Sequence, residues 1–182
     1  MTDLTTLASF KAYAGVVIAT DDAMLTSLIS AYSEFARSYC NRDFTLRTYS
    51  RRLDGLNTRR QMVSQVPIGS VTSVTVDTQT IAAQIAFGQP GYYFDSISVM
   101  LEGYRFTRGI GNVAITWTGG YATIPADVAQ AVNEMVGLRY KLRDKMEWSS
   151  KGLAGETVSL ITKDMPSASK RILDQYKSVV AI

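Results

Sequence analysis

Two acidic residues lie close enough in the sequence to raise the question of metal chemistry. Asp95 and Glu102 are seven positions apart, and Glu102 opens the stretch Glu-Gly-Tyr-Arg. Two carboxylates can hold Mg²⁺, and in metal-dependent nucleases a nearby lysine assists the reaction. Here Arg105 takes the place of that lysine, and a guanidinium cannot serve as a neutral base. Two interpretations remain, a carboxylate–metal nuclease and, the one we favour, two solvated acids around a β-hairpin.

The absence of histidine removes most other enzymatic chemistry. None of the 182 residues is His, which excludes Ser-His-Asp and Cys-His catalysis and every His-ligated metal site. The single cysteine, Cys40, excludes an intramolecular disulfide and a four-thiolate metal site, and we expect it to be a small core residue. The stretch Arg-Gly-Ile-Gly-Asn at 108–112 lacks the helix and the third glycine of a dinucleotide-binding loop, so it predicts a turn.

The positive charge is concentrated in one block. The formal net charge is +3, but residues 1–36 sum to −3, 37–60 to +5, 61–138 to −3 and 139–182 to +4. Five arginines, interleaved with Tyr49, fall on a predicted extended hairpin: Arg47, Arg51, Arg52, Arg59 and Arg60. Arginines on a hairpin can contact phosphates without reading base sequence, with an affinity that falls as salt rises. The alternatives are a solvated face, or ion pairs with acids of a neighbouring subunit.

The composition is that of a soluble globular protein, with 46% apolar and 19% charged residues. Residues 109–126 carry no charge, but their Gly, Pro, Thr and Tyr content makes a membrane span implausible. The N-terminal stretch has no basic region ahead of an apolar core, so it does not read as a secretory signal. We therefore expect a single domain over 1–182, made in a cytoplasm and without a membrane partner.

Hydrophobic periodicity predicts helices at both ends of the chain and strands between them. Helices are expected at 3–15 and 20–42, the second with Thr20 as its N-cap, and strands from about 44 to 118. A long helix is then expected from Pro125 to about Met146 or Trp148. A loop at 149–155, a brief strand at 156–162 and a last helix after Pro166 complete the chain. This order predicts an α+β fold. Its helical core has two N-terminal helices, one long helix after residue 125 and a short C-terminal helix, and the strands form antiparallel β-hairpins or a sheet.

The stretch Asn-Val-Ala-Ile-Thr-Trp-Thr-Gly-Gly-Tyr-Ala-Thr-Ile-Pro at 112–125 combines three signals. Alternating residues up to Trp117 predict a strand with one buried face. Gly119 and Gly120 then allow a sharp corner, because glycine adopts backbone angles denied to other residues. Pro125 suits a first helical position, and Asp127 places a negative charge in the first turn of the helix.

This segment resembles the head–tail connector proteins of tailed double-stranded DNA bacteriophages, also called adaptor or head-completion proteins. In that family a strand ends in an aromatic-Thr-small-Gly-Tyr corner, followed by a helix that starts with proline and an acid. The matching residues are Trp117, Thr118, Gly119, Gly120, Tyr121, Pro125 and Asp127. Residues 21–44 are similar to the family's first long helix, and the stretch from Val66 to Asp77 to its Pro-Val-x-x-Val-x-x-Val strand. The resemblance covers most of residues 3–176.

The resemblance implies a structural virion protein without enzymatic activity or cofactor. About a dozen copies would form a ring beneath the portal protein, extend the DNA channel and offer a docking surface to a tail or stopper protein. The five arginines would line the channel or contact the next subunit. We place the portal contact in a C-terminal extension, 152–182, with Leu160, Ile172 and Tyr176 as candidates. The location implied is the virion, after synthesis in the host bacterial cytoplasm; the alternative function is a non-enzymatic DNA-binding or packaging-associated phage protein.

Overall fold

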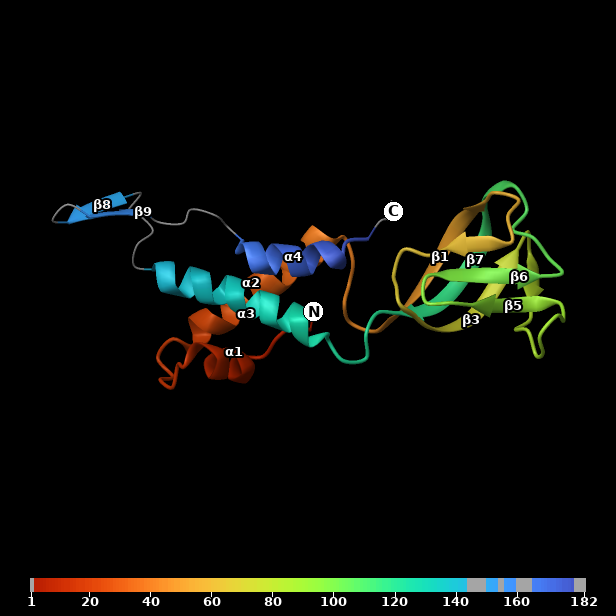
Figure 1. Cartoon of the computed structure of the whole chain (residues 1–182). Helices are drawn as coiled ribbons and strands as arrows, with labels where there is room; N and C mark the ends of the chain where they lie inside the picture. Colours follow the sequence, from red (N-terminus) through yellow and green to blue (C-terminus); the bar gives the residue numbers. More distant parts are fainter. Residues whose placement is uncertain (1, 144–149, 154–155, 160–164, 179–182) are drawn as a thin grey trace. The chain divides into compact units, whose positions relative to one another are not determined.

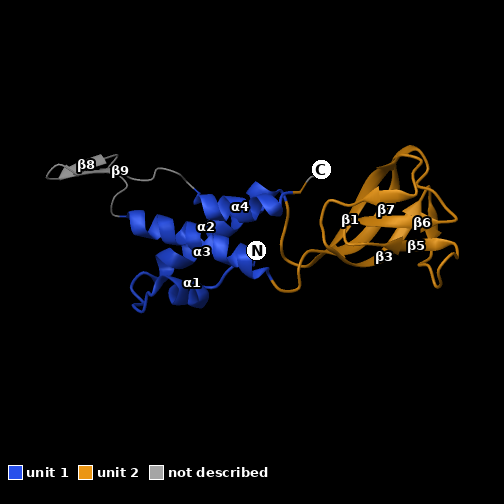
Figure 2. Ribbon diagram, in the orientation of Figure 1, with its two compact units in different colours: residues 1–41, 124–177 blue, residues 42–123, 178–182 orange. Residues whose placement is uncertain are grey.

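The structure is a computed structural model that describes residues 2–143, 150–153, 156–159 and 165–178. The chain divides into two compact units (Figure 2). Unit 1 contains residues 1–41 and 124–177, and unit 2 contains residues 42–123 with 178–182. Unit 1 is helical and is built from both ends of the chain, whereas unit 2 carries the strands from its middle. The mixed α+β class is therefore as predicted. The single connector domain with an extension from residue 152 stays a prediction.

Among its described residues, unit 1 contains four helices (Figure 1): α1 (Leu7–Ala14), α2 (Asp22–Cys40), α3 (Ala126–Leu142) and α4 (Ser167–Gln175). α1 begins later than predicted because the Thr6 hydroxyl caps it, accepting a hydrogen bond from the Ser9 amide at 3.1 Å. α2 begins at Asp22 with Asp21 in the cap position, so the predicted cap at Thr20 is wrong by one residue. Cys40 is fully buried at the end of α2, which confirms that it is a small core residue.

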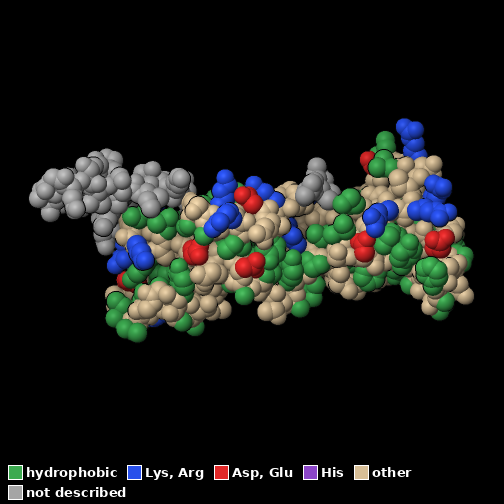
Figure 3. Space-filling view, viewed as in Figure 1, with side chains coloured by type: hydrophobic (Ala, Val, Ile, Leu, Met, Phe, Trp, Pro, Cys, Tyr) green, Lys and Arg blue, Asp and Glu red, His purple; other side chains and the backbone are tan. Residues whose placement is uncertain are grey.

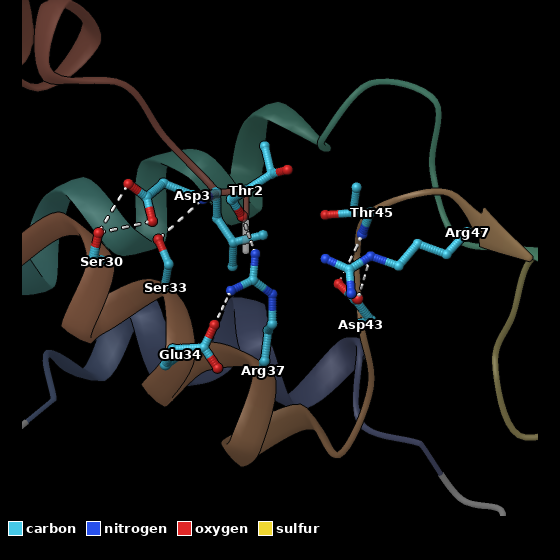
Figure 4. Close-up of polar contacts among 10 residues, drawn as sticks. Thr2, Asp3, Ser30, Ser33, Glu34, Arg37, Asp43, Thr45 and Arg47 are labelled. Atoms are coloured by element: carbon cyan, nitrogen blue, oxygen red, sulfur yellow. Dashed lines mark hydrogen bonds and ion pairs between the residues drawn. The ribbon is translucent and has the colours of Figure 1, made fainter.

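Polar contacts tie the N-terminal segment to the helices of unit 1 (Figure 4). The buried Arg37 of α2 donates to the Glu34 carboxylate and to the Thr2 carbonyl, so its charge is both paired and hydrogen-bonded. The amide of Leu4 donates to the Ser33 hydroxyl at 3.0 Å. Because these partners lie about thirty residues apart, they hold the segment before α1 against α2.

Unit 2 consists of two antiparallel sheets that share one core. The strands are β1 (Arg47–Gly55), β2 (Arg60–Met62), β3 (Ile68–Val76), β4 (Gln79–Ile81), β5 (Gly91–Phe94), β6 (Ser98–Glu102) and β7 (Gly109–Gly119). Their orders are β1-β7-β3-β4 and β2-β6-β5. The fully buried Val113, Ile115 and Trp117 of β7 pack with Val99 and Leu101 of β6, so the core lies between the sheets.

The C-terminal region departs from the sequence analysis in one place. Residues Ser150–Leu153 form a strand, β8, that pairs antiparallel with β9 (Glu156–Ser159). The strand predicted at 156–162 is confirmed for Glu156–Ser159, and its remaining residues lie outside the described ones. The loop predicted over 149–155 is wrong for 150–153, because these residues pair with β9 in a hairpin. α3 is described to Leu142, and the predicted continuation to Met146 or Trp148 lies outside the described residues. Within the described ranges, no helix is long and apolar enough to span a membrane.

Candidate nucleic-acid and subunit interface

The five arginines predicted as a contact surface lie on one side of unit 2. Arg47, Arg51 and Arg52 belong to β1 and Arg60 to β2, with Arg59 directly before β2. β1 and β2 are edge strands of their sheets. β5, the opposite edge strand of the smaller sheet, contacts β3 of the larger sheet, and the Tyr92 hydroxyl donates to the Val71 carbonyl at 3.0 Å. Because β5 lies against β3, the other edge strand of the smaller sheet, β2, lies toward β1. We call this side, formed by β1, β2 and residues 56–59 between them, the basic edge.

Three of these arginines have acidic partners within unit 2. Arg47 Nε lies 3.2 Å from Asp43 (Figure 4), and Arg60 donates to Asp95 at 2.9 Å. Arg59 lies 3.9 Å from Glu102. All three pairs are at least partly exposed, so each contributes little to stability and leaves the arginine able to exchange its partner for a phosphate.

Arg51 and Arg52 differ from the other three. Neither has an acidic partner or a hydrogen-bond acceptor among the residues that the structure describes, and both are exposed. The register pairs Arg51 with the buried Ile115 and Arg52 with Ala114 of β7. Because successive residues of a strand point to opposite faces, Arg51 lies on the core face of the sheet and Arg52 on its outer face. A partner with a flat surface therefore contacts the side chains of Arg51 and Arg52 to different extents.

The outer face of the larger sheet is covered with hydroxyl groups. Three neighbouring strands contribute seven Ser and Thr residues at matched positions: Thr48, Ser50, Ser70, Ser73, Thr75, Thr116 and Thr118. Some bridge the strands, with the hydroxyls of Ser50 and Thr116 3.1 Å apart and those of Ser70 and Thr118 2.9 Å apart. Arg52 lies at the end of this face, where it lines a pocket together with Asp77 and Asn112. Such a face offers many hydrogen bonds, each of modest net strength.

Unit 2 carries the whole net charge of the chain. Residues 42–123 contain eight arginines, five acidic residues and no lysine, a formal charge of +3, which equals that of the full sequence. Figure 3 shows the blue side chains of this unit along one margin, and in residues 42–123 all of them are arginines. Arg108 adds a further exposed guanidinium with no acidic partner in the described part of the chain. The sequence pattern around Arg108 predicts only a turn. Because every positive charge between residues 42 and 123 is an arginine, this shared composition could have marked Arg108 as part of the same basic surface.

The two carboxylates considered for a metal site have structural roles instead. Asp95 accepts hydrogen bonds from the amides of Ile97 and Ser98 at 2.8 and 2.7 Å, and it pairs with Arg60. These contacts, the Ile97 amide first, hold the pKa of Asp95 below its usual value. Glu102 pairs with Arg59. Over the described ranges, no group of three or more His, Cys, Asp or Glu side chains is placed to hold a metal ion.

The corner after β7 closes unit 2. The indole of Trp117, which is 0% exposed, donates to the Gln65 carbonyl at 2.9 Å. A Cβ on Gly119 would lie 2.4 Å from that same carbonyl oxygen, and Gly120 has a φ of +106°. Tyr121 then pairs with residues 44–46, with its amide donating to the Phe44 carbonyl at 2.9 Å. These four residues therefore fix how the chain leaves the β unit, which is a structural role.

Pro125 and Asp127, the last two residues of the matching segment, belong to unit 1. Pro125 occupies the cap position of α3, one residue before the first helical residue, Ala126, whereas the sequence placed it inside the helix. The carboxylate of Asp127 accepts hydrogen bonds from the Val128 amide at 2.9 Å and from the hydroxyl of Tyr176. Of the predicted portal contacts, Tyr176 is thus engaged with α3, Ile172 is half-buried on α4, and Leu160 lies outside the described residues.

Comparison with known proteins identifies the family. The chain matches the head completion protein family over residues 3–179, nearly its whole length. The chain belongs to this family. The predicted resemblance to head–tail connector proteins is thereby confirmed. No curated protein matches the chain.

Solved structures share the fold of this head completion protein. One, the "Neck of native GTA particle computed with C12 symmetry", is 19% identical with a TM-score of 0.59. Another, the "Neck of empty GTA particle computed with C6 symmetry", is 18% identical with a TM-score of 0.57. A third, from the "Virion of native gene transfer agent (GTA) particle", is 20% identical with a TM-score of 0.57. Each comparison covers 100% of this chain and 96% of the other.

Proposed function

We propose that this head completion protein is a structural virion protein that forms a ring, joins the capsid portal to the tail and extends the DNA channel. The observation that carries the proposal is the family match over residues 3–179, supported by a fold shared along the whole chain with proteins of particle necks. The role is structural and involves no turnover. The chain is made in the host bacterial cytoplasm and ends in the virion.

The ring is supported by the symmetry of the related necks, which were computed with C6 and C12 symmetry. A closed ring of identical copies requires a heterologous interface, in which one surface of each copy meets a different surface of the next. We therefore propose a dodecameric ring of this chain bound to the portal protein on one side and to a tail or stopper protein on the other.

The basic edge and the hydroxyl-covered face are our candidates for the surface that faces DNA. Arg51 and Arg52 supply guanidinium groups that no acid neutralises within the described part of unit 2, and hydroxyls cover the rest of the outer face. Contacts of this kind are non-specific, because they reach phosphates and not base edges. The paired Arg47, Arg59 and Arg60 are the candidates for contacts to acids of a neighbouring copy.

The C-terminal region is the proposed portal contact, and the structure changes how it should be tested. Leu173 is fully buried and Ser169 donates to Glu134 at 2.7 Å, so α4 is part of the packing of unit 1. Deleting 152–182 would therefore damage the helical unit as well as the contact. Replacing only 150–163 with a Gly-Ser linker of equal length keeps α4. We expect this variant to fold and to lose portal binding, and unchanged binding would refute a portal contact through residues 150–163.

Particle assembly tests the proposal as a whole. Particles assembled without this protein should contain portal and capsid but lack attached tails, and adding purified protein should restore attachment. A matched control is the linker variant of 150–163, which should fail to restore it. Tailed particles in the absence of the protein would overturn the proposed role.

A second candidate function is a DNA-binding or packaging-associated protein, favoured because Arg51 and Arg52 have no acidic partner among the residues that the structure describes. It predicts that the free chain binds duplex DNA with an affinity that falls steeply with salt. Because the two arginines lie on opposite faces, Arg51→Glu and Arg52→Glu should be measured separately. A large loss in only one variant would also identify the face that meets DNA.

A further inference from the structure

Unit 1 exposes large apolar side chains in two separate places. One is the corner between α1 and α2, with Val17, Ile18 and Met24, and with Tyr13 at the end of α1 beside Gly137 of α3. The other is a groove on α2 and α3, where Phe35 is 39% exposed. These five are the large hydrophobic side chains that the described part of unit 1 leaves exposed. Two distinct apolar surfaces on one chain are what a heterologous interface needs.

The groove has the composition of a protein interface. It has a volume of about 470 Å³ and is lined by Leu28, Ala31, Tyr32, Phe35 and Arg139. The rings of Tyr32 and Phe35 lie 6.2 Å apart in an edge-to-face arrangement, which fixes the floor of the groove. Arg139 is exposed, and among the described residues it has no acidic partner. Aromatic residues and arginine are enriched in protein interfaces.

The corner is a fixed projection. Val17 is 91% exposed and Ile18 57% exposed, although the loop that carries them is held in place. The ammonium of Lys11 donates to the Ile18 carbonyl at 2.9 Å and to the Asp22 carboxylate at 2.8 Å. A loop that is already ordered loses little conformational freedom on binding, so its apolar side chains contribute more of their burial to affinity.

We propose that the α1–α2 corner of one copy docks into the α2–α3 groove of the next copy and so forms part of the ring interface. The occupant is a second copy because the same chain carries both surfaces and because their charges are complementary. Residues 11–24 have a net charge of −1: Lys11 pairs with Asp22, which leaves the carboxylate of Asp21, the acceptor of a hydrogen bond from Tyr140. The groove contributes the positive charge of Arg139. This inference rests on the proposed ring, and it names the surfaces that build it.

Disulfide trapping tests the docking in the complex with the portal. Val17→Cys with Ala31→Cys places one thiol on the corner and one in the groove. Val17 precedes α2, and Ala31 lies nine residues beyond the first residue of that helix, Asp22, a rise of about 14 Å. A bridge within one copy would leave the chain a covalent monomer, so only bridges between copies give covalent multimers. Oxidation of the assembled complex should give a ladder of covalent multimers. Variants with only one of the two introduced cysteines should give none, because the native Cys40 is fully buried. The matched pair of Val17→Cys with Ser38→Cys, whose second thiol lies about two turns further along α2, should also give none.

The outcomes separate this inference from the proposed function. The copy number per portal, measured by native mass spectrometry under reducing conditions, reports the ring without reference to any disulfide. A ring with no ladder, or with an equal ladder from the Ser38 pair, overturns the docking but leaves the ring standing. Absence of any multi-copy assembly overturns both. In a second test, Val17→Asp should leave thermal stability unchanged and reduce the copies bound per portal at least tenfold; full assembly would contradict the docking.

Discussion

Gly120→Ala should destabilise unit 2 strongly, because the corner after β7 leaves no room for a side chain. The residue has a φ of +106°, a conformation that costs about 1–2 kcal/mol for an L-residue. A Cβ would lie 2.5 Å from the Thr45 carbonyl oxygen and 3.0 Å from the Leu46 amide. Relieving this contact must shift backbone that holds two hydrogen bonds, from Leu46 to the Tyr121 carbonyl and from Gly120 to the Pro67 carbonyl. With about 1 kcal/mol for each bond, the expected loss is about 3–4 kcal/mol.

Gly88→Ala is the matched control for this prediction. Gly88 also has a positive φ, +81°, but a Cβ there would meet nothing within 4 Å, so only the backbone cost of about 1–2 kcal/mol applies. The two variants therefore differ by about 2 kcal/mol. For a unit of this size each kcal/mol changes the melting temperature by about 4–8 °C, so Gly120→Ala should melt roughly 8–16 °C below the Gly88 variant. Circular dichroism during heating measures both. Equal melting temperatures for the two variants would refute the argument from the corner.

Three further perturbations test other parts of the account. Trp117→Phe should lower the free energy of unfolding by about 2 kcal/mol or more in urea, since it empties space in the core and removes the donor to the Gln65 carbonyl. The lowered pKa of Asp95 means that its stabilisation is present above the ordinary value of about 3.9 and is lost as the pH falls through the lowered pKa. Asp95→Asn should therefore flatten the dependence of the melting temperature on pH between about 5 and 3; an unchanged slope would contradict the capping role. Finally, Arg52→Glu should reduce the salt-sensitive retention of duplex DNA by the assembled ring, and Thr48→Ala, on the same face but uncharged, should not.

The elements with strong local signals could be predicted from the sequence. The apolar stripe of α2 and the Gly-Gly corner after Trp117 are set by spacing and by backbone freedom within a few residues. β8 could not be predicted in this way, because its residues have little strand preference and it is stabilised by pairing with β9. The assignment of strands to two sheets was equally out of reach, since it depends on contacts between residues far apart in the chain.

The candidate site was predicted in composition but not in detail. The arginine block and its position on extended chain were visible in the sequence. The acidic partners of these arginines could not be predicted. Asp95, for example, lies thirty-five residues after Arg60, and the sequence offers no rule that pairs the two. The difference between Arg51 and Arg52 follows from simple strand alternation, and it became meaningful only once the register showed which face of β1 covers the core.

Native mass spectrometry of this protein, co-expressed with the portal protein from the same genome, tests the central claim most directly. The proposed function predicts a complex with about a dozen copies of this chain on each portal ring. Two folded proteins that form no complex would contradict it, and salt-dependent titration of the free chain with duplex DNA would then test the alternative function.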